Sequence, residues 1–400
     1  MVVTVPTNHD DVDEKLLQEL MLLSWASYLG PHPRVIDAHA RSFYFDVQSK
    51  CPFAQNLSLS DTLESGFQGI MEPMRLVKFF SSDQVSTRGA FVDAQAFLAQ
   101  TNDNKRIFLG VRGSSSVFDC LTNLNTSRTR WEPDEDKARG SAGFCACLDI
   151  LCPKGKPMVH LGWYQCLLAL RPVFDELKKL SRSPDVNEIN FCGHSQGGAL
   201  AFMLCAWFLE EMEHTVVTLV QRNVRMNLCT IGQPRVGDDK FTSHFMHLTS
   251  ILRDAGLINI LRVANSGDVC VKFPPAAAGY EHAVHPIVYE YETTSGVNAE
   301  MNLNVKMKFG DKFECNEKKA LEKFGVEDTD GFERELINLD HNKAGKTIMT
   351  RNLDLEKIDD VKAAHEPKMY YKCFAKVKEG GLGGEQKGGV GVADVNVDGV

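Results

Sequence analysis

The stretch Asn190-Phe191-Cys192-Gly193-His194-Ser195-Gln196-Gly197-Gly198-Ala199-Leu200 decides the fold of this 400-residue chain. It contains Gly-x-Ser-x-Gly, preceded by a short apolar segment typical of a buried strand and followed by apolar residues at helical spacing. Such a strand-to-helix turn is strained and lifts its serine off the sheet, as a nucleophile requires. The two glycines of the motif avoid side chains where strand and helix crowd together. Ser195 is therefore predicted to be a nucleophile, and the helix that starts there turns its N–H groups toward a developing oxyanion.

Strands and helices alternate on both sides of this turn. Strands are expected at residues 94–99, 106–111, 226–231, 258–263, 286–292 and 302–309, from their short apolar runs bounded by turn residues. Helices are expected from about residue 13 to 30 and from 162 to 180, the second with a kink at Pro172. This alternation predicts an α/β fold, with a mostly parallel central sheet and helices on both faces. The last two strands are expected to be antiparallel partners at its edge.

The bulk composition excludes several classes of function. A net charge of -9 and a pI near 5.8 leave no basic face for a nucleic acid. Residues 1–13 lack the basic start and apolar core of a signal peptide, and the longest apolar run, 199–209, is too short to span a bilayer. The twelve cysteines show no paired Cys-x-x-Cys spacing, and several lie within apolar runs. They are expected to be reduced core thiols of a cytosolic protein.

A serine nucleophile needs a general base and a carboxylate that orients this base. In chains with this kind of turn the order is serine, acid, histidine, so both partners are expected after Ser195. Asp268 is the favoured acid because it follows the carboxyl end of a predicted strand, where open α/β sheets place functional loops. The histidines beyond it are His282, His285, His341 and His365.

Position alone separates these histidines only in part. His341 lies in a loop beyond the last predicted strands, from which it could reach back over the sheet edge. His282 and His285 flank a short apolar segment that leads into a strand, where a structural histidine is the simpler interpretation. These positions put His341 slightly ahead and leave the others open.

Four motifs, taken in order, resemble those of the class 3 lipases, the family of the fungal triacylglycerol lipases. They are Arg112-Gly113-Ser114-Ser115-Ser116, the turn Gly193-His194-Ser195-Gln196-Gly197-Gly198-Ala199, the run Gly232-Gln233-Pro234-Arg235-Val236-Gly237, and Asn265-Ser266-Gly267-Asp268 with Pro274-Pro275. The resemblance covers roughly residues 90–341. It implies an α/β-hydrolase fold with Ser195 as nucleophile, Asp268 as acid and His341 as base, since Asp340-His341 matches the family's usual Asp-His pair. It also implies an oxyanion hole formed by Ser114 and the backbone N–H of Gln196.

The resemblance implies a serine ester hydrolase that cleaves acylglycerol or phospholipid esters through an acyl-enzyme, with no cofactor and no metal. Its substrate would be a lipid ester, met at a lipid–water interface. A soluble carboxylesterase for small or aryl esters, and a non-catalytic lipase-like binding or signalling protein, are the alternatives. The expected location is cytoplasmic, with peripheral contact at lipid droplets or membranes as an option.

The domain organisation is expected to be simple. Residues 1–378 form one α/β-hydrolase domain, and the Gly-rich residues 379–400 form a disordered tail. Residues 115–157 combine apolar side chains such as Trp131 and Phe144 with a charged run at 132–139. This segment is predicted to be a lid that turns its apolar side toward a lipid surface.

Overall fold

A computed structural model of the chain describes residues 12–29, 58–81, 94–113, 127–133, 155–211, 213–268, 270–293, 303–309 and 365–379. Its centre is an eight-stranded sheet with the strand order β1-β2-β3-β6-β7-β8-β9-β10. The strands are β1 (Met74–Ser81), β2 (Gln95–Thr101), β3 (Arg106–Val111), β6 (Glu188–His194), β7 (Arg225–Ile231), β8 (Ile258–Asn265), β9 (Ile287–Thr293) and β10 (Leu303–Phe309). The neighbours from β3 to β9 pair in parallel, whereas β1, β2 and β10 join antiparallel. This confirms the predicted α/β fold with a mostly parallel central sheet.

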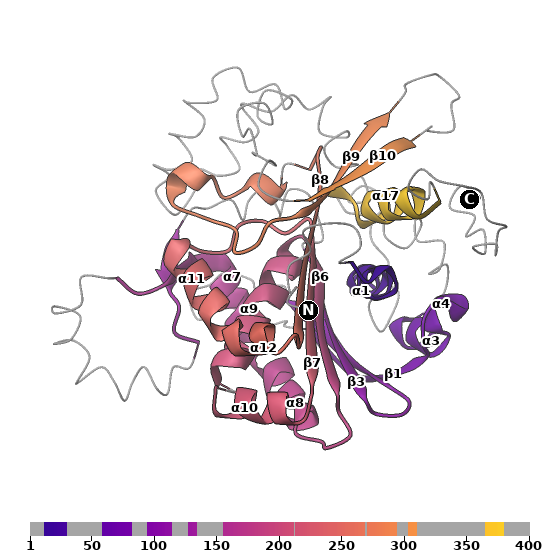
Figure 1. Cartoon of the computed structure of the whole chain (residues 1–400), viewed down its shortest axis with the longest axis vertical. Helices are drawn as coiled ribbons and strands as arrows, with labels where there is room; N and C mark the ends of the chain where they lie inside the picture. The colour runs from indigo at the N-terminus through magenta and orange to yellow at the C-terminus, as the bar shows by residue number, and fades with distance from the viewer. Residues whose placement is uncertain are drawn as a thin grey trace.

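Helices cover both faces of the sheet (Figure 1). On one face lie α7 (Leu161–Ala169), α8 (Arg171–Ser181), α9 (Gln196–Glu211), α10 (Glu213–Gln221), α11 (Asp239–Leu248) and α12 (Ser250–Asp254). On the other lie α1 (Glu14–Ala26), α3 (Leu59–Glu64), α4 (Gly66–Gly69) and α17 (Pro367–Glu379). Two short 3-10 turns, η2 (Cys270–Lys272) and η3 (Ala276–Ala278), follow β8.

The two cores on either side of the sheet follow from the alternation of side chains along each strand. In β6, Phe191 packs into the core under α9, and its neighbour Cys192 packs into the core under α1. Both side chains are fully buried. A strand covered on both faces is mostly apolar, and the buried Asn190 of β6 is accommodated by a hydrogen bond from its amide to the carbonyl oxygen of Ile107.

The predicted helix at 162–180 is two helices. The first, α7, ends at Ala169, and the second, α8, begins at Arg171 with Pro172 in its first turn. Proline has no backbone N–H to donate within a helix but fits the first turn, where that N–H has no intrahelical acceptor. Pro172 therefore starts a new helix and does not kink a continuous one.

Helix α1 is fixed to the sheet by a charge cluster. The guanidinium of Arg106 in β3 binds the carboxylate of Glu19 in α1, and its Nε lies 2.8 Å from Glu188 in β6. Because Glu19 is buried, the loss of Arg106 would leave an uncompensated carboxylate inside the protein. The cluster sets the position of α1 along the sheet, and with it the position of Tyr28 beyond the helix end.

A small second sheet lies beside the main one. It pairs β4 (Arg128–Arg130) with β5 (Met158–His160) in antiparallel fashion. The two strands belong to the beginning and the end of the segment predicted to be a lid. Most of that segment, residues 115–126 and 134–154, lies outside the described residues, as does the tail beyond Glu379.

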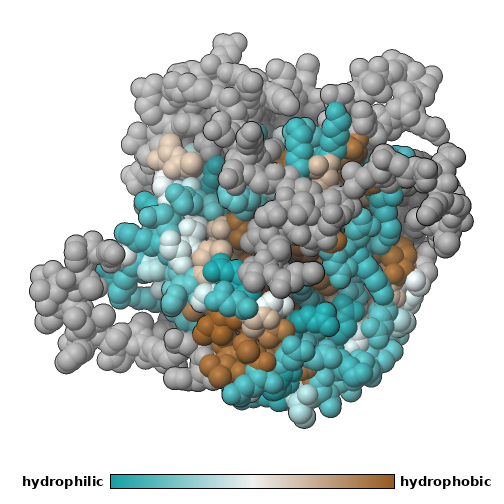
Figure 2. Space-filling view, viewed as in Figure 1, coloured by the Kyte–Doolittle hydropathy of each residue, from teal (hydrophilic) through white to brown (hydrophobic). Residues whose placement is uncertain are grey.

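The space-filling view shows an apolar area over α10 and α12 (Figure 2). Its exposed apolar side chains are Val217 and Ile251, which are 51% and 52% exposed. Every helix in the described ranges is too short or too polar to cross a membrane.

Candidate active site

Ser195 lies at a sharp turn between the end of β6 and the start of α9. Its backbone is left-handed, with φ of 58°, which is unusual for a residue with a side chain. The turn is held by a hydrogen bond from the Ser195 N–H to the carbonyl of Ile231 in β7, 2.8 Å away. This is the strained strand-to-helix geometry that the Gly-x-Ser-x-Gly motif predicts.

The two glycines of the motif are required by the closeness of the backbone. A Cβ on Gly193 would lie 2.3 Å from the carbonyl oxygen of Gly197, and a Cβ on Gly197 would lie 2.2 Å from the carbonyl oxygen of Val111. These contacts involve main-chain atoms that cannot turn away. Alanine at either position would therefore push α9 away from β3 and β6 and displace the serine.

Three side chains from separate parts of the chain meet at this turn. His365 Nε2 lies 2.8 Å from Ser195 Oγ, and His365 Nδ1 lies 2.7 Å from Asp268 Oδ2. All three residues are fully buried. Asp268 follows β8 and His365 immediately precedes α17. The arrangement has the geometry of a serine nucleophile, a base and an orienting acid.

The histidine in this arrangement differs from the favoured prediction. The sequence put His341 ahead, and His341 lies outside the described residues. The position between Ser195 and Asp268 is filled by His365, so the candidate base becomes His365. The loop position favoured in the sequence did not point to His365, which is brought to the site by α17, the helix that follows it and packs onto the sheet beside α1.

The carboxylate of Asp268 has two further donors. The backbone N–H of Cys270 donates to Oδ1 over 2.8 Å, and the hydroxyl of Tyr370 donates to Oδ2 over 2.6 Å. The Tyr370 oxygen also accepts the backbone N–H of Asn265. Burial, and then the neighbouring carboxylate, raise the pKa of Tyr370 well above its usual range, so the phenol stays a donor. These bonds fix the direction in which Asp268 faces His365.

His194, the neighbour of the serine, connects the turn to two other parts of the chain. Its Nδ1 lies 2.8 Å from the hydroxyl of Tyr28, and its Nε2 lies 2.7 Å from the carbonyl oxygen of His365. Burial, and then the nearby imidazole of His365, lower the pKa of His194 well below its usual value. A neutral ring suits both bonds: it accepts from Tyr28 and donates to the carbonyl.

Of the two residues predicted for the oxyanion hole, the structure describes Gln196 but not Ser114. Gln196 is the first residue of α9, so its backbone N–H belongs to the helix end that carries positive partial charge. Its side-chain amide contacts Cys166 Sγ at 3.3 Å. Ser114 lies outside the described residues. The preceding residue, Gly113, is so close to the turn that a Cβ there would lie 2.4 Å from the His194 carbonyl oxygen.

His282, another of the histidine candidates, is engaged away from the serine turn. His282 binds the carbonyl oxygen of Val271 through Nε2 over 2.8 Å. Burial, and then the positive charges of Arg262 and Arg235, lower its pKa well below the usual value. This is the behaviour of a structural histidine, which was the simpler interpretation of its sequence position.

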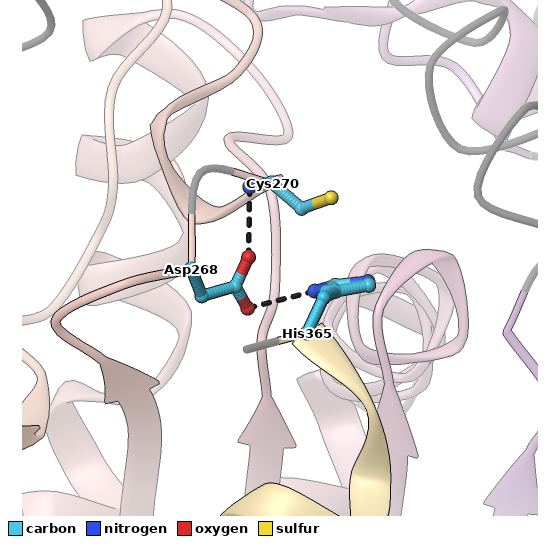
Figure 3. Close-up of side chains that lie close together, drawn as sticks. All are labelled: Asp268, Cys270 and His365. Atoms are coloured by element: carbon cyan, nitrogen blue, oxygen red, sulfur yellow. Dashed lines mark hydrogen bonds and ion pairs between the residues drawn. The ribbon is translucent and has the colours of Figure 1, made fainter. Parts of the chain in front are cut away.

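One group of metal-binding side chain types is found among the described residues, and it overlaps the triad. Asp268, Cys270 and His365 each offer a ligand atom, and these atoms lie within 4.8 Å of one another. Figure 3 shows Cys270 and His365 on either side of the Asp268 carboxylate, which accepts the backbone N–H of Cys270.

The base of the predicted lid is packed firmly against the domain. Trp131 is 5% exposed, its ring lies 4.9 Å from that of Phe241, and its Nε1–H donates to Glu210 of α9 over 2.8 Å. Lys156 pairs with Glu132 over 2.7 Å. The described ends of the predicted lid, residues 127–133 and 155–157, are therefore packed against the domain, whereas the rest of the segment 115–157 lies outside the described residues.

Comparison with known proteins supports the resemblance seen in the sequence. Residues 108–278 match the model of the class 3 lipases. The chain is 26% identical over 212 residues to a lipase of Rhizomucor miehei, covering 53% of this chain and 47% of that protein. It is 26% identical over 191 residues to the secreted mono- and diacylglycerol lipase 1 of Fusarium solani, covering 47% of this chain and 45% of that protein. The chain thus spans about half the length of these relatives.

Among solved structures, the mono- and diacylglycerol lipase of Aspergillus oryzae is 18% identical, with a TM-score of 0.43 over 75% of this chain and 88% of that one. The triacylglyceride lipase of Rhizomucor miehei is 18% identical, with a TM-score of 0.42 over 75% of this chain and 88% of that one.

A weak signal for His365 was present in the sequence. The residue is followed by Glu366 and Pro367, and Pro367 opens an amphipathic segment with Met369, Tyr370, Cys373 and Phe374 at helical spacing. A histidine that directly precedes a packed helix is held more firmly than one in a long loop. Tyr28 and Tyr370 carried no signal, because their partners lie 166 and 102 positions away.

Proposed function

We propose that this chain is a serine ester hydrolase that cleaves acylglycerol or phospholipid esters, because residues 108–278 match the model of the class 3 lipases. One observation carries the proposal: His365 lies between Ser195 Oγ and Asp268 Oδ2 at hydrogen-bond distance on both sides. A buried chain of hydroxyl, imidazole and carboxylate is the arrangement that activates a serine.

The reaction would proceed through an acyl-enzyme. Ser195 Oγ attacks the ester carbonyl while His365 Nε2 takes the hydroxyl proton, and the imidazolium then returns this proton to the leaving alcohol. A water molecule, activated by the same nitrogen, releases the acid. Asp268 holds the proton of His365 on Nδ1, so that Nε2 is free to accept one at each step.

The developing negative charge would be stabilised at the start of α9. The backbone N–H of Gln196 and the residue Ser114 are the proposed donors, and the positive end of the helix adds to their effect. Each such donor acts mainly on the transition state, because the ground-state carbonyl carries little charge.

The family match favours lipid esters over small or aryl esters as the proposed substrates. The relatives described above include mono- and diacylglycerol lipases, and the chain would act on the same class of bond. A lipase-like binding protein without catalysis is less favoured, because such a protein has no need for the strained serine or for the orienting carboxylate.

The proposed location is the one expected from the sequence, the cytoplasm, with peripheral contact at lipid droplets or membranes as an option. Its support is chemical: six described cysteines are buried and are not part of disulfides within the described residues. Reduced thiols are typical of cytosolic proteins. The Fusarium solani relative is a secreted protein, and fractionation of cells that produce the chain would decide between the two locations.

The proposal is tested by labelling the purified protein with a fluorophosphonate and by assaying emulsified triacylglycerol, phospholipid and short aryl esters. Wild type is expected to be labelled and to hydrolyse the lipid esters, whereas Ser195→Ala should do neither and should retain its circular dichroism spectrum. Labelling without lipid hydrolysis would favour the small-ester alternative. Failure of the folded wild type to be labelled would favour the binding protein.

A further inference from the structure

The triad carries a thiol that ester hydrolysis does not use. Cys270 lies two positions after Asp268, in the 3-10 turn that follows β8, and it is 2% exposed. Only its backbone N–H is involved in the bond to Asp268. The side chain is not part of the hydrolytic mechanism proposed above, yet it lies against the two residues that control the proton of the base (Figure 3).

The three side chains provide the donor atoms that zinc prefers. A thiolate sulfur, an imidazole nitrogen and a carboxylate oxygen all occur in zinc sites, with bonds of about 2.0–2.3 Å in tetrahedral geometry. Neighbouring ligand atoms in such a site are therefore about 3.5 Å apart. In this protein one ligand atom from each residue lies within 4.8 Å of the others, so a shift of about an ångström would bring them to bonding distance.

We infer that Asp268, Cys270 and His365 form an inhibitory site for Zn²⁺ within the triad. The nitrogen nearest the carboxylate is His365 Nδ1, 2.7 Å from Asp268 Oδ2, so the ion takes the place of the proton between them. A water molecule completes the fourth position. The sequence predicted no metal site because the three ligands are not arranged in a recognisable spacing.

Zinc binding at Nδ1 would switch the base off by changing its tautomer. Neutral imidazole has one N–H, which moves from Nδ1 to Nε2 when Nδ1 donates its lone pair to the ion. The Cys270 thiol loses its proton to solvent and binds as thiolate, so one proton is released for each zinc bound. With its proton on Nε2, His365 donates to Ser195 Oγ and can no longer accept the hydroxyl proton.

The types of ligand atom also predict which metal ions should bind. A thiolate and an imidazole favour Zn²⁺, Co²⁺ and Cd²⁺ over Mg²⁺ and Ca²⁺, which prefer sites made only of oxygen. Magnesium or calcium at the same concentration should therefore leave the site empty. The inhibition half of this inference rests on the proposed function, whereas the binding half does not.

Co²⁺ is the probe for binding, because it replaces Zn²⁺ and shows a thiolate-to-metal charge-transfer band. Titration of the purified full chain with Co²⁺ is expected to give this band and, by equilibrium dialysis, one bound ion that Cys270→Ala lacks. Cys205→Ala is the matched control, since it removes a buried thiol in the core beneath α9 and should keep the band. An unchanged band and stoichiometry in Cys270→Ala would overturn the inference.

The effect on hydrolysis is then measured for each variant relative to its own rate in the presence of a chelator. Zn²⁺ should inhibit wild type and Cys205→Ala reversibly, and loss of the thiolate in Cys270→Ala should raise the inhibitory concentration by at least about tenfold. Equal inhibition of the wild type and both variants by Zn²⁺ would contradict the inference. If the protein hydrolyses no ester, the proposed function fails, and the cobalt band still tests the metal site.

Discussion

The hydroxyl of Tyr370 donates a hydrogen bond over 2.6 Å to Asp268 Oδ2, the same oxygen that faces His365. One oxygen thus receives a donor from the imidazole and another from the phenol. Tyr370 comes from α17, five positions after His365, so a single helix end places both the base and the group that steadies the acid.

The Tyr370→Phe variant should hydrolyse esters more slowly without binding them less well. Hydrogen bonds to charged groups contribute about 1.5–3 kcal/mol, and part of this acts on the imidazolium state, so kcat should fall by about tenfold. The variant should also be less stable, because the Asn265 N–H loses its acceptor. Tyr371→Phe is the control, since its hydroxyl contacts Gln18 and lies outside the triad. Steady-state kinetics with unchanged kcat for Tyr370→Phe would contradict the positioning role.

The His365→Ala variant should lose hydrolysis by several orders of magnitude, because no other described group lies between Ser195 and Asp268. His341→Ala is its matched control and should retain the activity of wild type. Fluorophosphonate labelling of both variants checks the same assignment without a substrate. If His341→Ala were inactive and His365→Ala were active, His341 would be the base instead.

The Ser114→Ala variant tests the predicted oxyanion hole. Removal of one donor to the oxyanion is expected to lower kcat by about a hundredfold with little change in KM, since the donor acts on charge that develops during the reaction. The neighbouring Ser115→Ala should have no such effect. A rise in KM with unchanged kcat would assign Ser114 to substrate binding instead.

The stability of the fold should decrease below about pH 6.5 because of His194. Burial, and then His365, hold the pKa of His194 well below its usual value of 6.5. In this range the unfolded chain takes up a proton that the folded protein does not, so the stabilisation present at higher pH is lost as the pH falls. The loss is at most about 1.4 kcal/mol per pH unit for this residue, and His282 adds to it in the same direction.

Urea unfolding at about pH 7.5 and pH 5.5 measures this effect. The His194→Gln variant should show a smaller decrease between the two conditions, by up to about 1.4 kcal/mol. His247→Gln changes an exposed histidine of α11 and should follow wild type. Equal decreases in all three proteins would show that His194 does not contribute.

Interfacial activation, if it depends on a lid, should be lost when residues 134–154 alone are replaced by a short Gly-Ser linker. The expected signal in wild type is a sharp rise in rate as a short-chain triacylglycerol passes its solubility limit, and a smooth curve in the deletion variant. A deletion that also removes Trp131 is unsuitable, because truncation of a packed tryptophan destabilises a domain by about 3–5 kcal/mol. A sharp rise that persists after the shorter deletion would rule out the lid.

Local patterns in the sequence predicted most of the fold. The hairpin of β2 and β3, the central strands, the serine turn and the antiparallel pair β9–β10 agree with their apolar periods and turn residues. Asp268 could be predicted as well, because a strand end is a local feature and the sheet brings strand ends together. The Ser195–Asp268 half of the proposed site could therefore be expected from the sequence.

The other half depends on contacts that no local pattern encodes. His365 reaches Asp268 across 97 positions of sequence, and His194 meets Tyr28 across 166. Four histidines after Asp268 were chemically equivalent candidates, and only the docking of α17 beside α1 distinguishes His365 from the rest. The choice among equal side chains was thus a question of tertiary packing.

His365 lies 170 positions after Ser195, so the ribosome adds it long after the serine turn. By the time a ribosome has added β9, the nascent polypeptide already contains all five parallel strands, the serine turn and Asp268. Domains are able to begin folding while they are still being made, at about 5–20 residues per second. Until His365 and α17 have been translated and that helix has docked beside α1, the emerging protein holds Ser195 without the histidine that we propose as its base. A nascent chain that has not yet reached His365 would therefore lack the proposed base, whatever else of the sheet has already formed.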